Sequence, residues 1–410
     1  MIAMSREIAL VSVAWLSYCL RRSFISSQAT RSQNGQQPMT SGQRLPASLS
    51  TLDAALAGLL RGLEPLAVVE LPLREALGCV IAEWPPLEAF PPHDLAAVDG
   101  WPLRASDLVG ASSYTPVPLM TSPVWVEAGD QMPRGCDCVI DADSVDEAGP
   151  VIQVLTEAIP GQGVRRAGGH IPDGFVMASG ARFRALDLVV ARSAGLETIG
   201  VRRPRLRIVN VPASNGDLTT TRLIEENARS VGTEVVYTEA ASRDVASIAN
   251  ALDATACDLL VTIGGSGVGR TDAAVLALAE RGEVLAHGIA LQPGRTSAIG
   301  RIAKTPVIAV PGSADQALAA WWTLALPVLD RLSGRQPRAV TILPLARKLA
   351  SSVGIADVAL LGREDDRWVP LAVGELPFKT LVSAEAWLVV PDSSEGFAAG
   401  TPVGAYLLKA

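Results

Sequence analysis

Four glycines within six residues form the most distinctive chemical feature of this 410-residue chain. Residues 264–269 read Gly-Gly-Ser-Gly-Val-Gly, follow the apolar stretch 258–263, and precede Asp272 by three positions. Glycine lets a backbone approach a ligand closely and turn its amide N–H groups toward an anion. The run lacks the Gly-Lys-Ser/Thr ending of a Walker loop and does not follow the first strand, where a dinucleotide fingerprint would lie. We therefore predict an anion site that includes Gly264, Gly265, Ser266, Gly267 and Gly269.

Two further turns and an arginine pair carry groups that could bind the same anion. Residues 311–313 (Pro-Gly-Ser) lead into a helical pattern, and residues 292–297 (Gln-Pro-Gly-Arg-Thr-Ser) add a cation and two hydroxyl groups. Exposed turns with a solvated arginine use the same residue types, which leaves a purely structural role open. An arginine pair suits bidentate binding of phosphate or carboxylate, although it could equally be solvated. The further expected binding residues are Pro293, Gly294, Arg295, Ser297, Pro311, Gly312, Ser313, Arg165 and Arg166.

Three aspartates at or near predicted loop ends, Asp99, Asp244 and Asp272, are the candidate acids. Asp244 and Asp272 each precede a helical pattern, and aspartate is a favoured residue at a helix N-cap. The spacing along the chain does not show whether the three side chains meet. A capping role and a role in chemistry therefore both stay open for these acids.

The segment from 204 to 336 alternates between strand and helix patterns. Apolar stretches of strand length are each followed by a stretch with helix period. The expected strands are 206–211, 234–237, 258–263 and 306–310, and the expected helices are 223–231, 245–252, 273–278 and 315–332. This alternation predicts a parallel sheet covered on both faces by helices, with ligands bound at the carboxyl ends of its strands. The glycine-rich turn and residues 311–313 both follow such strand ends.

Short β-rich segments flank this α/β region. Residues 52–63 show a helix period, residues 68–73 are extended, and residues 74–77 predict a short helix. Short strand patterns punctuated by Gly and Pro occupy 101–157 and return after 339. The expected fold is multidomain α/β, with small β-rich domains on either side of a central parallel-sheet domain. The expected domains are 50–84 together with 163–203, then 85–162, 204–336 and 337–410.

Composition restricts the class of partner and the compartment. The chain is 49% hydrophobic and 19% charged with a net charge of −7, which is typical of a globular protein and gives no general attraction for nucleic acid or anionic membranes. Its five scattered cysteines indicate buried thiols in a reducing compartment, so a cytoplasmic location is expected. Cys136 and Cys138 lack a second cysteine or histidine pair at zinc-site spacing, and three histidines are too few for a multi-histidine centre.

The first 49 residues are expected to lie outside the folded protein. Residues 8–20 are apolar, but this stretch is shorter than the roughly 20 residues that a membrane helix needs. Residues 23–46 are rich in Ser, Gln, Arg and Thr, which indicates disorder. We interpret residues 1–49 as a disordered or spurious extension, with Met39 as a possible true start, and keep a cleaved export signal as the alternative.

Together these motifs resemble the molybdenum insertase family, which includes MoeA and the gephyrin E domain. The glycine-rich turn with Asp272, the Pro-Gly-Arg turn at 293–295 and the Pro-Gly turn at 311–312 occur in the family's order. The likeness extends to residues 71–78, 94–100, 133–137, 164–168 and 383–396. It therefore covers about residues 50–410.

The resemblance implies a molybdopterin molybdenumtransferase, which takes adenylylated molybdopterin and molybdate, inserts the metal into the dithiolene and releases AMP. It implies a MogA-like central domain and an elongated homodimer, with residues 50–84 and 163–203 as the linker and dimerisation domain. The active site would lie between the sheet domain of one subunit and the small β domain of the other. By motif position, Asp99, Asp244 and Asp272 would be catalytic, and Asp244 and Asp272 would bind Mg²⁺.

Several positions depart from the family pattern. Ala128 stands where the family has threonine, His170 where it has aspartate, and Gln292 where it has lysine. The glutamate that follows the family's first sheet strand has no clear counterpart. An impaired molybdopterin-binding carrier or chaperone, which delivers the cofactor to a molybdoenzyme, is therefore the alternative, and a scaffold for protein contacts is a third. A molybdoenzyme or a MogA-like protein would be the partner, with no nucleic acid or membrane involved.

Overall fold

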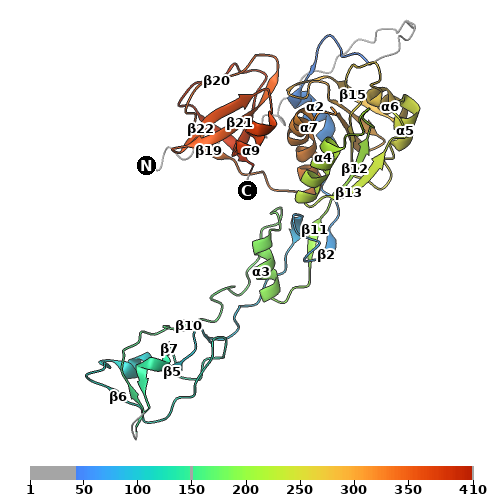
Figure 1. Ribbon diagram of the computed structural model, residues 1–410. Coiled ribbons are helices and arrows are strands. Elements are labelled where there is room, and N and C mark those ends of the chain that lie inside the picture. Colours follow the sequence, from blue (N-terminus) through green and yellow to red (C-terminus); the bar gives the residue numbers. More distant parts are fainter. Residues whose placement is uncertain (1–42, 148–150, 409–410) are drawn as a thin grey trace.

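The structure is a computed structural model that describes residues 43–147 and 151–408. Figure 1 shows an elongated molecule in which the α/β module and the C-terminal β module lie together at one end, and a narrow arm leads through a linker module to a small distal β module. None of the helices in the described part of the chain is long and apolar enough to cross a membrane. The multidomain α/β fold expected from the sequence is therefore confirmed.

The α/β module is built on a six-stranded sheet. Its strands run in the order β13 (Glu234–Glu239), β12 (Arg205–Asn210), β14 (Leu259–Ile263), β18 (Thr305–Val310), β17 (Ala298–Ile302) and β15 (Glu283–His287). The first four are parallel, as predicted, whereas β17 is antiparallel to both β18 and β15. Strands β15 and β17 were not predicted, because nearby Gly282, Gly288 and Gly294 give this region the pattern of a loop.

Helices cover both faces of this sheet. They are α4 (Thr219–Ser230), α5 (Val245–Ala251), α6 (Ala274–Arg281) and a long helix formed by α7 (Ala314–Ala320), a π-helical turn (Trp321–Ala325) and α8 (Leu326–Ser333). Buried side chains alternate along β14, so that Leu259 and Val261 face the core with α4, α7 and α8, whereas Leu260 faces the core with α5 and α6. This alternation confirms a sheet that is buried on both faces.

The N-terminal helix α2 (Leu52–Leu60) packs on the α/β module. Leu52 and Leu59 are buried in the core that also contains β12, β14 and α8. The preceding strand β1 (Ser50–Thr51) pairs with β16 (Ile289–Gln292). The sequence predicted the helix, but it grouped these residues with the linker domain, because an apolar stripe does not show which module covers it. Residues 43–49 are also part of the fold, so the expected unstructured extension 1–49 was too long; residues 1–42, with the apolar stretch 8–20, lie outside the described residues.

The linker module contains a three-stranded antiparallel sheet and one helix. The strands are β2 (Val69–Pro72), β11 (Thr198–Arg202) and β3 (Val80–Glu83), and the helix is α3 (Ala185–Ser193). The helix predicted at 74–77 is wrong, because these residues form consecutive turns between Pro72 and Gly78, too short a span to nucleate a helix. Gly232, at the end of α4, has a φ of +75°, and a Cβ there would lie 2.2 Å from the Cys79 nitrogen, so the linker and α/β modules are in close backbone contact.

The distal module is a small set of short strands around a modest core. Its elements are β4 (Leu95–Ala96), β5 (Trp101–Leu103), β6 (Val117–Pro118), β7 (Cys138–Ile140), β8 (Val145–Asp146), β9 (Gln153–Val154), β10 (Val164–Arg165) and the 3₁₀ turns Ala105–Leu108 and Ala142–Ser144. Cys138 is buried between these strands and burial raises the pKa of its thiol to about 11, which suits an inert core residue.

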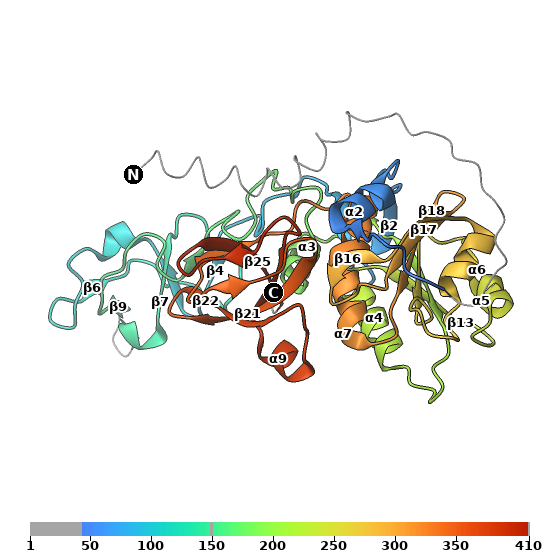
Figure 2. The same cartoon turned by 90° about the horizontal axis from the view of Figure 1, so that it is seen from above.

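The C-terminal module shares a sheet with the α/β module. Its elements are β19 (Thr341–Pro344), β20 (Leu349–Ala350), β21 (Ala356–Glu364), β22 (Arg367–Val373), α9 (Phe378–Ser383), β23 (Ala386–Val390), β24 (Gly396–Phe397) and β25 (Pro402–Leu407). Strand β16, which leaves and re-enters the α/β module, pairs in parallel with β21. The rings of Trp322 and Trp387 stack with centroids 4.9 Å apart across the same junction. The two modules therefore lie side by side in close contact (Figure 2).

Candidate functional site

A small polar cavity lies at the carboxyl edge of the parallel strands. Strands β14 and β18 end as neighbours, since Ile263 pairs with Val310, and the two predicted loops leave them together. The cavity has a volume of about 230 Å³. It is lined by Asn210, Val211, Ala213, Asp217, Thr220, Thr221, Arg243, Ile263, Gly264, Gly265, Gly267, Asp272, Thr296, Pro311, Gly312, Ser313 and Gln316. The two loops identified from their glycines thus form one concave site, as expected for an open α/β sheet.

The backbone of residues 264–269, which we call the glycine loop, adopts a conformation that needs glycine. Gly264 and Gly265 have φ angles of +90° and +70°, in the left-handed region that other residues rarely enter. Within the described part of the chain, the amides of Ser266, Gly267 and Val268 find no hydrogen-bond acceptor. Unpaired amides beside a cavity are suitable donors for phosphate oxygens. The geometry therefore supports an anion site at this loop.

Asp272 closes the glycine loop rather than capping a helix. Its Oδ2 accepts a hydrogen bond of 2.9 Å from the Gly269 amide, and its Oδ1 lies 2.9 Å from a guanidinium nitrogen of Arg243. Helix α6 begins two residues later, at Ala274, and its N-cap Ala273 makes no side-chain hydrogen bond. A Cβ at position 267 would lie 2.5 Å from Asp272 Oδ2, so this glycine makes room for the carboxylate. The loop, the carboxylate and the arginine are therefore one connected unit.

Asp244 has the capping role that the sequence left open. It is the N-cap of α5 and accepts a 2.9 Å hydrogen bond from the Ser247 amide. The hydroxyl groups of Ser242 and Ser247 also donate to its carboxylate. These hydrogen bonds lower the pKa of Asp244 to about 2. The Ser242 hydroxyl has the largest effect, followed by the amide and hydroxyl of Ser247. Its side chain does not line the small cavity.

This capping role leads to a prediction about stability. Replacing Asp244 with alanine is expected to lower the melting temperature, whereas asparagine should leave it nearly unchanged, because asparagine caps helices about as well as aspartate. The folded pKa of about 2 lies below the usual 3.8, so the charged cap stabilises the protein at neutral pH and this contribution is lost as the pH falls through about 2. Thermal melts from pH 7 down to pH 2 measure both effects, and an asparagine variant as unstable as the alanine variant would contradict the capping role.

The described side chains of one subunit do not form a Mg²⁺ site made of protein ligands alone. Within residues 43–147 and 151–408, no group of three or more His, Cys, Asp or Glu side chains could hold a metal ion. Asp272 already binds Arg243 and the Gly269 amide, and both oxygens of Asp244 accept hydrogen bonds from serines. Magnesium is usually held by one or two carboxylates together with substrate phosphates and water. At Asp272, the neighbouring positive charge is instead supplied by Arg243.

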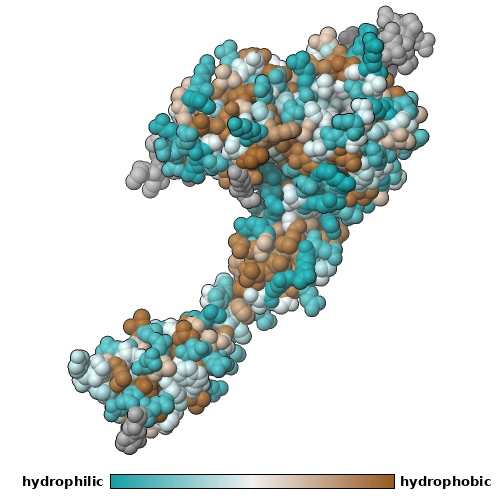
Figure 3. Space-filling view, viewed as in Figure 1, coloured by the Kyte–Doolittle hydropathy of each residue, from teal (hydrophilic) through white to brown (hydrophobic). Residues whose placement is uncertain are grey.

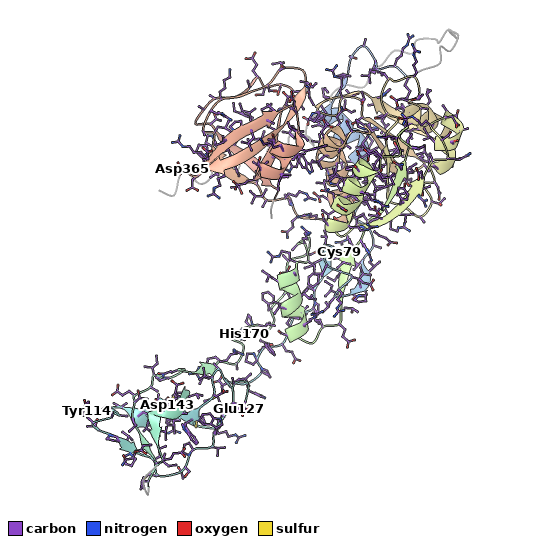
Figure 4. The ribbon with its side chains drawn as sticks, in the orientation of Figure 1. Cys79, Tyr114, Glu127, Asp143, His170 and Asp365 are labelled. Atoms are coloured by element: carbon purple, nitrogen blue, oxygen red, sulfur yellow. The ribbon has the colours of Figure 1, made fainter. Side chains whose placement is uncertain are left out.

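The remaining candidate residues lie along the arm, away from the cavity of their own chain. Asp99 Oδ1 accepts a 2.7 Å hydrogen bond from the Ala128 amide. Arg166 lies 2.8 Å from Asp94, and the Ala167 amide and this arginine lower the pKa of that carboxyl. Figure 4 places Glu127, the neighbour of Ala128, in the distal module and His170 at its junction with the linker. Within one subunit the structure therefore does not bring Asp99, Arg165 or Arg166 to the glycine loop.

A larger cavity lies between the α/β and C-terminal modules. It has a volume of about 560 Å³ and is lined by Leu291, Gln292, Pro293, Gly294, Arg295, Asp315, Gln316, Gly374, Glu375, Leu376, Pro377 and Phe378. Gln316 lines both this cavity and the small one. The predicted Pro293, Gly294 and Arg295 thus face the larger cavity, whereas Ser297 is fully buried with an unpaired hydroxyl and Thr296 faces the small one.

Sequence reasoning overlooked the start of α4. The Thr220 hydroxyl donates a 2.6 Å hydrogen bond to the Gly312 carbonyl, and the Thr221 hydroxyl donates to Asn210, which in turn donates to Glu239. These side chains connect the carboxyl end of β12, at Asn210, to the loop that follows β18. Three consecutive threonines at a helix start were a visible signal, but nothing in the sequence showed that they would face the cavity.

Comparison with known proteins agrees with this arrangement. Residues 50–195 match a model of the MoeA N-terminal region (domain I and II), and residues 214–331 match a model described as a probable molybdopterin binding domain. The chain is 26% identical over 387 residues to the molybdopterin molybdenumtransferase of Synechococcus elongatus, covering 83% of this chain and 94% of that protein. It is 29% identical over 322 residues to molybdopterin molybdenumtransferase 2 of Mycobacterium tuberculosis, covering 68% and 78%.

Solved structures show the same fold. The molybdopterin biosynthesis MoeA protein of Pyrococcus horikoshii aligns with a TM-score of 0.62 and 25% identity, covering 88% of this chain and 100% of that one. The two family models together span well over half of the chain. They cover the linker, distal and α/β modules in the order seen in the structure. The chain therefore belongs to the molybdopterin molybdenumtransferase (MoeA) family of molybdenum cofactor biosynthesis.

Proposed function

We propose that this protein binds adenylylated molybdopterin, inserts molybdenum from molybdate into the dithiolene and releases AMP. The observation that carries this proposal is the glycine loop, which has three unpaired amides and lines the small cavity with Gly264, Gly265 and Gly267, on a fold of the molybdopterin molybdenumtransferase family. The small cavity would bind phosphate oxygens through these amides. Arg243 adds the positive charge, because it is the only lysine or arginine among the described residues that line this cavity.

The larger cavity would take the rest of the substrate. It shares the lining residue Gln316 with the small one and presents the cation Arg295 from one module and the ring of Phe378 from the other. The Phe378 side chain is 62% exposed, so its face is available to a flat ring such as a pterin. Because Asp315 and Glu375 also line this cavity, a dianion such as molybdate would depend on Arg295 and on donors from elsewhere in the assembly.

A homodimer would complete the site. Asp99 lies in the distal module, so it can reach a glycine loop only if that loop belongs to a second subunit (Figure 1). The space-filling view shows an apolar surface over the linker module (Figure 3). It includes the α3 residues Leu186 and Val189, which are 75% and 62% exposed. An apolar surface on a linker of this kind suits a symmetric contact between two copies.

The carrier hypothesis is the second candidate, and one observation favours it. Asp244 and Asp272 are fully engaged by serines, a backbone amide and Arg243, which leaves few free oxygens for chemistry on the anhydride. A carrier would use the same amides to bind molybdopterin and would pass it to a molybdoenzyme or receive it from a MogA-like partner. We propose a cytoplasmic location for either role, because the four described cysteines, Cys79, Cys136, Cys138 and Cys257, are all free thiols.

Release of AMP separates the two functions. Purified protein is incubated with adenylylated molybdopterin, with and without molybdate, and AMP is measured by chromatography. Molybdate-dependent AMP release at catalytic turnover is the expected result. Tight binding of molybdopterin without AMP release would replace the transferase by the carrier, and absence of any molybdopterin binding would refute both.

A further inference from the structure

The side chain of Gln43 joins the N-terminal segment to the glycine loop. It is only 5% exposed, although it lies among the first residues of the described chain. Its Nε2 donates hydrogen bonds of 2.9 Å to the Gly265 carbonyl and 2.7 Å to the Gly267 carbonyl. Its Oε1 accepts from the Val275 amide at 2.7 Å and from the Leu276 amide at 3.3 Å, in the first turn of α6. One buried amide group therefore connects the loop to the helix that follows it.

These contacts fix the direction of three successive loop carbonyls. Gln43 binds the carbonyls of Gly265 and Gly267, and a ring nitrogen of His287 lies 3.0 Å from the Ser266 carbonyl between them. In a planar trans peptide the C=O and the following N–H point in opposite directions. The amides of Ser266, Gly267 and Val268 must therefore point away from Gln43 and His287. None of these three amides has an acceptor in the described part of the chain.

The segment that carries Gln43 is itself held firmly in place. The methyl groups of Leu45 and Leu49 pack closely over Gly288, where an added Cβ would lie 2.9 Å from each. The Ser50 amide donates to the Gly288 carbonyl at 3.0 Å, and β1 then continues along β16. The position of Gln43 is thus determined by a strand pairing and by packing, rather than by its own hydrogen bonds alone.

We propose that Gln43 is a positioning residue of the phosphate-binding site, which holds the glycine loop with its amides turned toward the bound anion. The inference rests on the proposed function for the identity of that anion, adenylylated molybdopterin or its molybdopterin product. It assigns a functional role to a segment that its composition marked as an unstructured extension. Gln43 does not line the cavity, so its effect must pass through the loop backbone.

Replacing Gln43 with glutamate separates its role as a hydrogen-bond donor to the loop carbonyls from its role as an acceptor for the first turn of α6. The carboxylate still accepts from the Val275 and Leu276 amides, but it has no N–H for the Gly265 and Gly267 carbonyls and repels them. Loss of the two hydrogen bonds that orient the loop predicts about tenfold or greater loss of affinity for molybdopterin. Gln43→Met removes both the donor and the acceptor at similar side-chain volume and should also lower the melting temperature. Ser48→Ala, at an exposed position of the same segment, is the matched control.

Two readouts on the full chain test the proposal. Titration with molybdopterin measures affinity, and hydrogen exchange follows the Gly269 and Ala274 amides, which are bonded to Asp272 and to the Gly265 carbonyl within the loop. Gln43→Glu is expected to weaken binding and to accelerate exchange at these amides, whereas Ser48→Ala changes neither. Wild-type affinity and exchange in Gln43→Glu would overturn the proposal. If the wild-type protein does not bind molybdopterin, the proposed function fails, and exchange alone decides whether Gln43 positions the loop.

Discussion

Replacing Asp272 with asparagine is expected to lower the rate of AMP release by about 100-fold or more, with a much smaller change in affinity for molybdopterin. The asparagine oxygen can still accept the hydrogen bond from the Gly269 amide and keep the loop closed. Its NH₂ group cannot pair with Arg243, however, so the guanidinium loses its charged partner and keeps only the Pro212 carbonyl and the Thr271 hydroxyl as acceptors beside the cavity. Binding through the loop amides should largely survive, whereas stabilisation of charge on the anhydride in the transition state should not.

A double-mutant cycle tests whether the ion pair acts as a unit. Arg243→Gln should reduce AMP release about as much as Asp272→Asn, and the double variant should be little worse than either, because the two side chains act through one contact. Asp253→Asn is the matched control, since it breaks the 3.0 Å ion pair with Arg207 in the same module without touching the cavity. Equal losses of affinity and rate in Asp272→Asn would show that the carboxylate only closes the loop.

Charges on the exposed face of α3 are expected to separate the subunits and abolish turnover. The double variant Leu186→Glu, Val189→Glu places two carboxylates on the apolar linker surface, and like charges from both copies would then meet at a symmetric interface. Sedimentation should show a monomer that keeps its fold and its affinity for molybdopterin but releases no AMP. Val353→Glu, at a position 62% exposed in the C-terminal module, should stay dimeric and active.

Subunit mixing tests the reason for that loss. Dimers of Asp99→Ala and of Asp272→Asn should each be inactive alone, because every site lacks one acid. Exchange of subunits gives mixed dimers in which one of the two sites is intact, so that roughly a quarter of wild-type activity should return after random exchange. If no activity returns although mixed dimers form, Asp99 does not act across the interface.

The sequence predicted the parts of the site that depend on local structure. The glycine loop and residues 311–313 could be located because each follows a buried strand, and parallel strands end at one edge of a sheet. The role of Gln43 could not be predicted, since it depends on contacts more than 200 residues away and one glutamine in a polar stretch has no signature. Asp244 remained ambiguous because a cap and a catalytic acid use the same residue type at a helix start.

Strand order and module assignment were harder to predict. The pattern of α2 showed a helix with an apolar face, but both neighbouring modules could have covered that face. Strands β15 and β17 are short and lie among glycines, and β16 leaves its own module, so this region gave no continuous alternation. The turn at 74–77 shows the opposite error, since four residues with helix-compatible side chains were too few to form a helix.

The pairing of β16 with β21 determines how much the larger cavity can change shape. Its walls, 293–295 and 374–378, are joined through this strand pair and through the stacked rings of Trp322 and Trp387. A hinge between these two modules would break main-chain hydrogen bonds, so the cavity is preorganised and its affinity is not reduced by a closing step. In the homodimer proposed above, entry and exit of substrate would then depend on the slender arm of the second subunit.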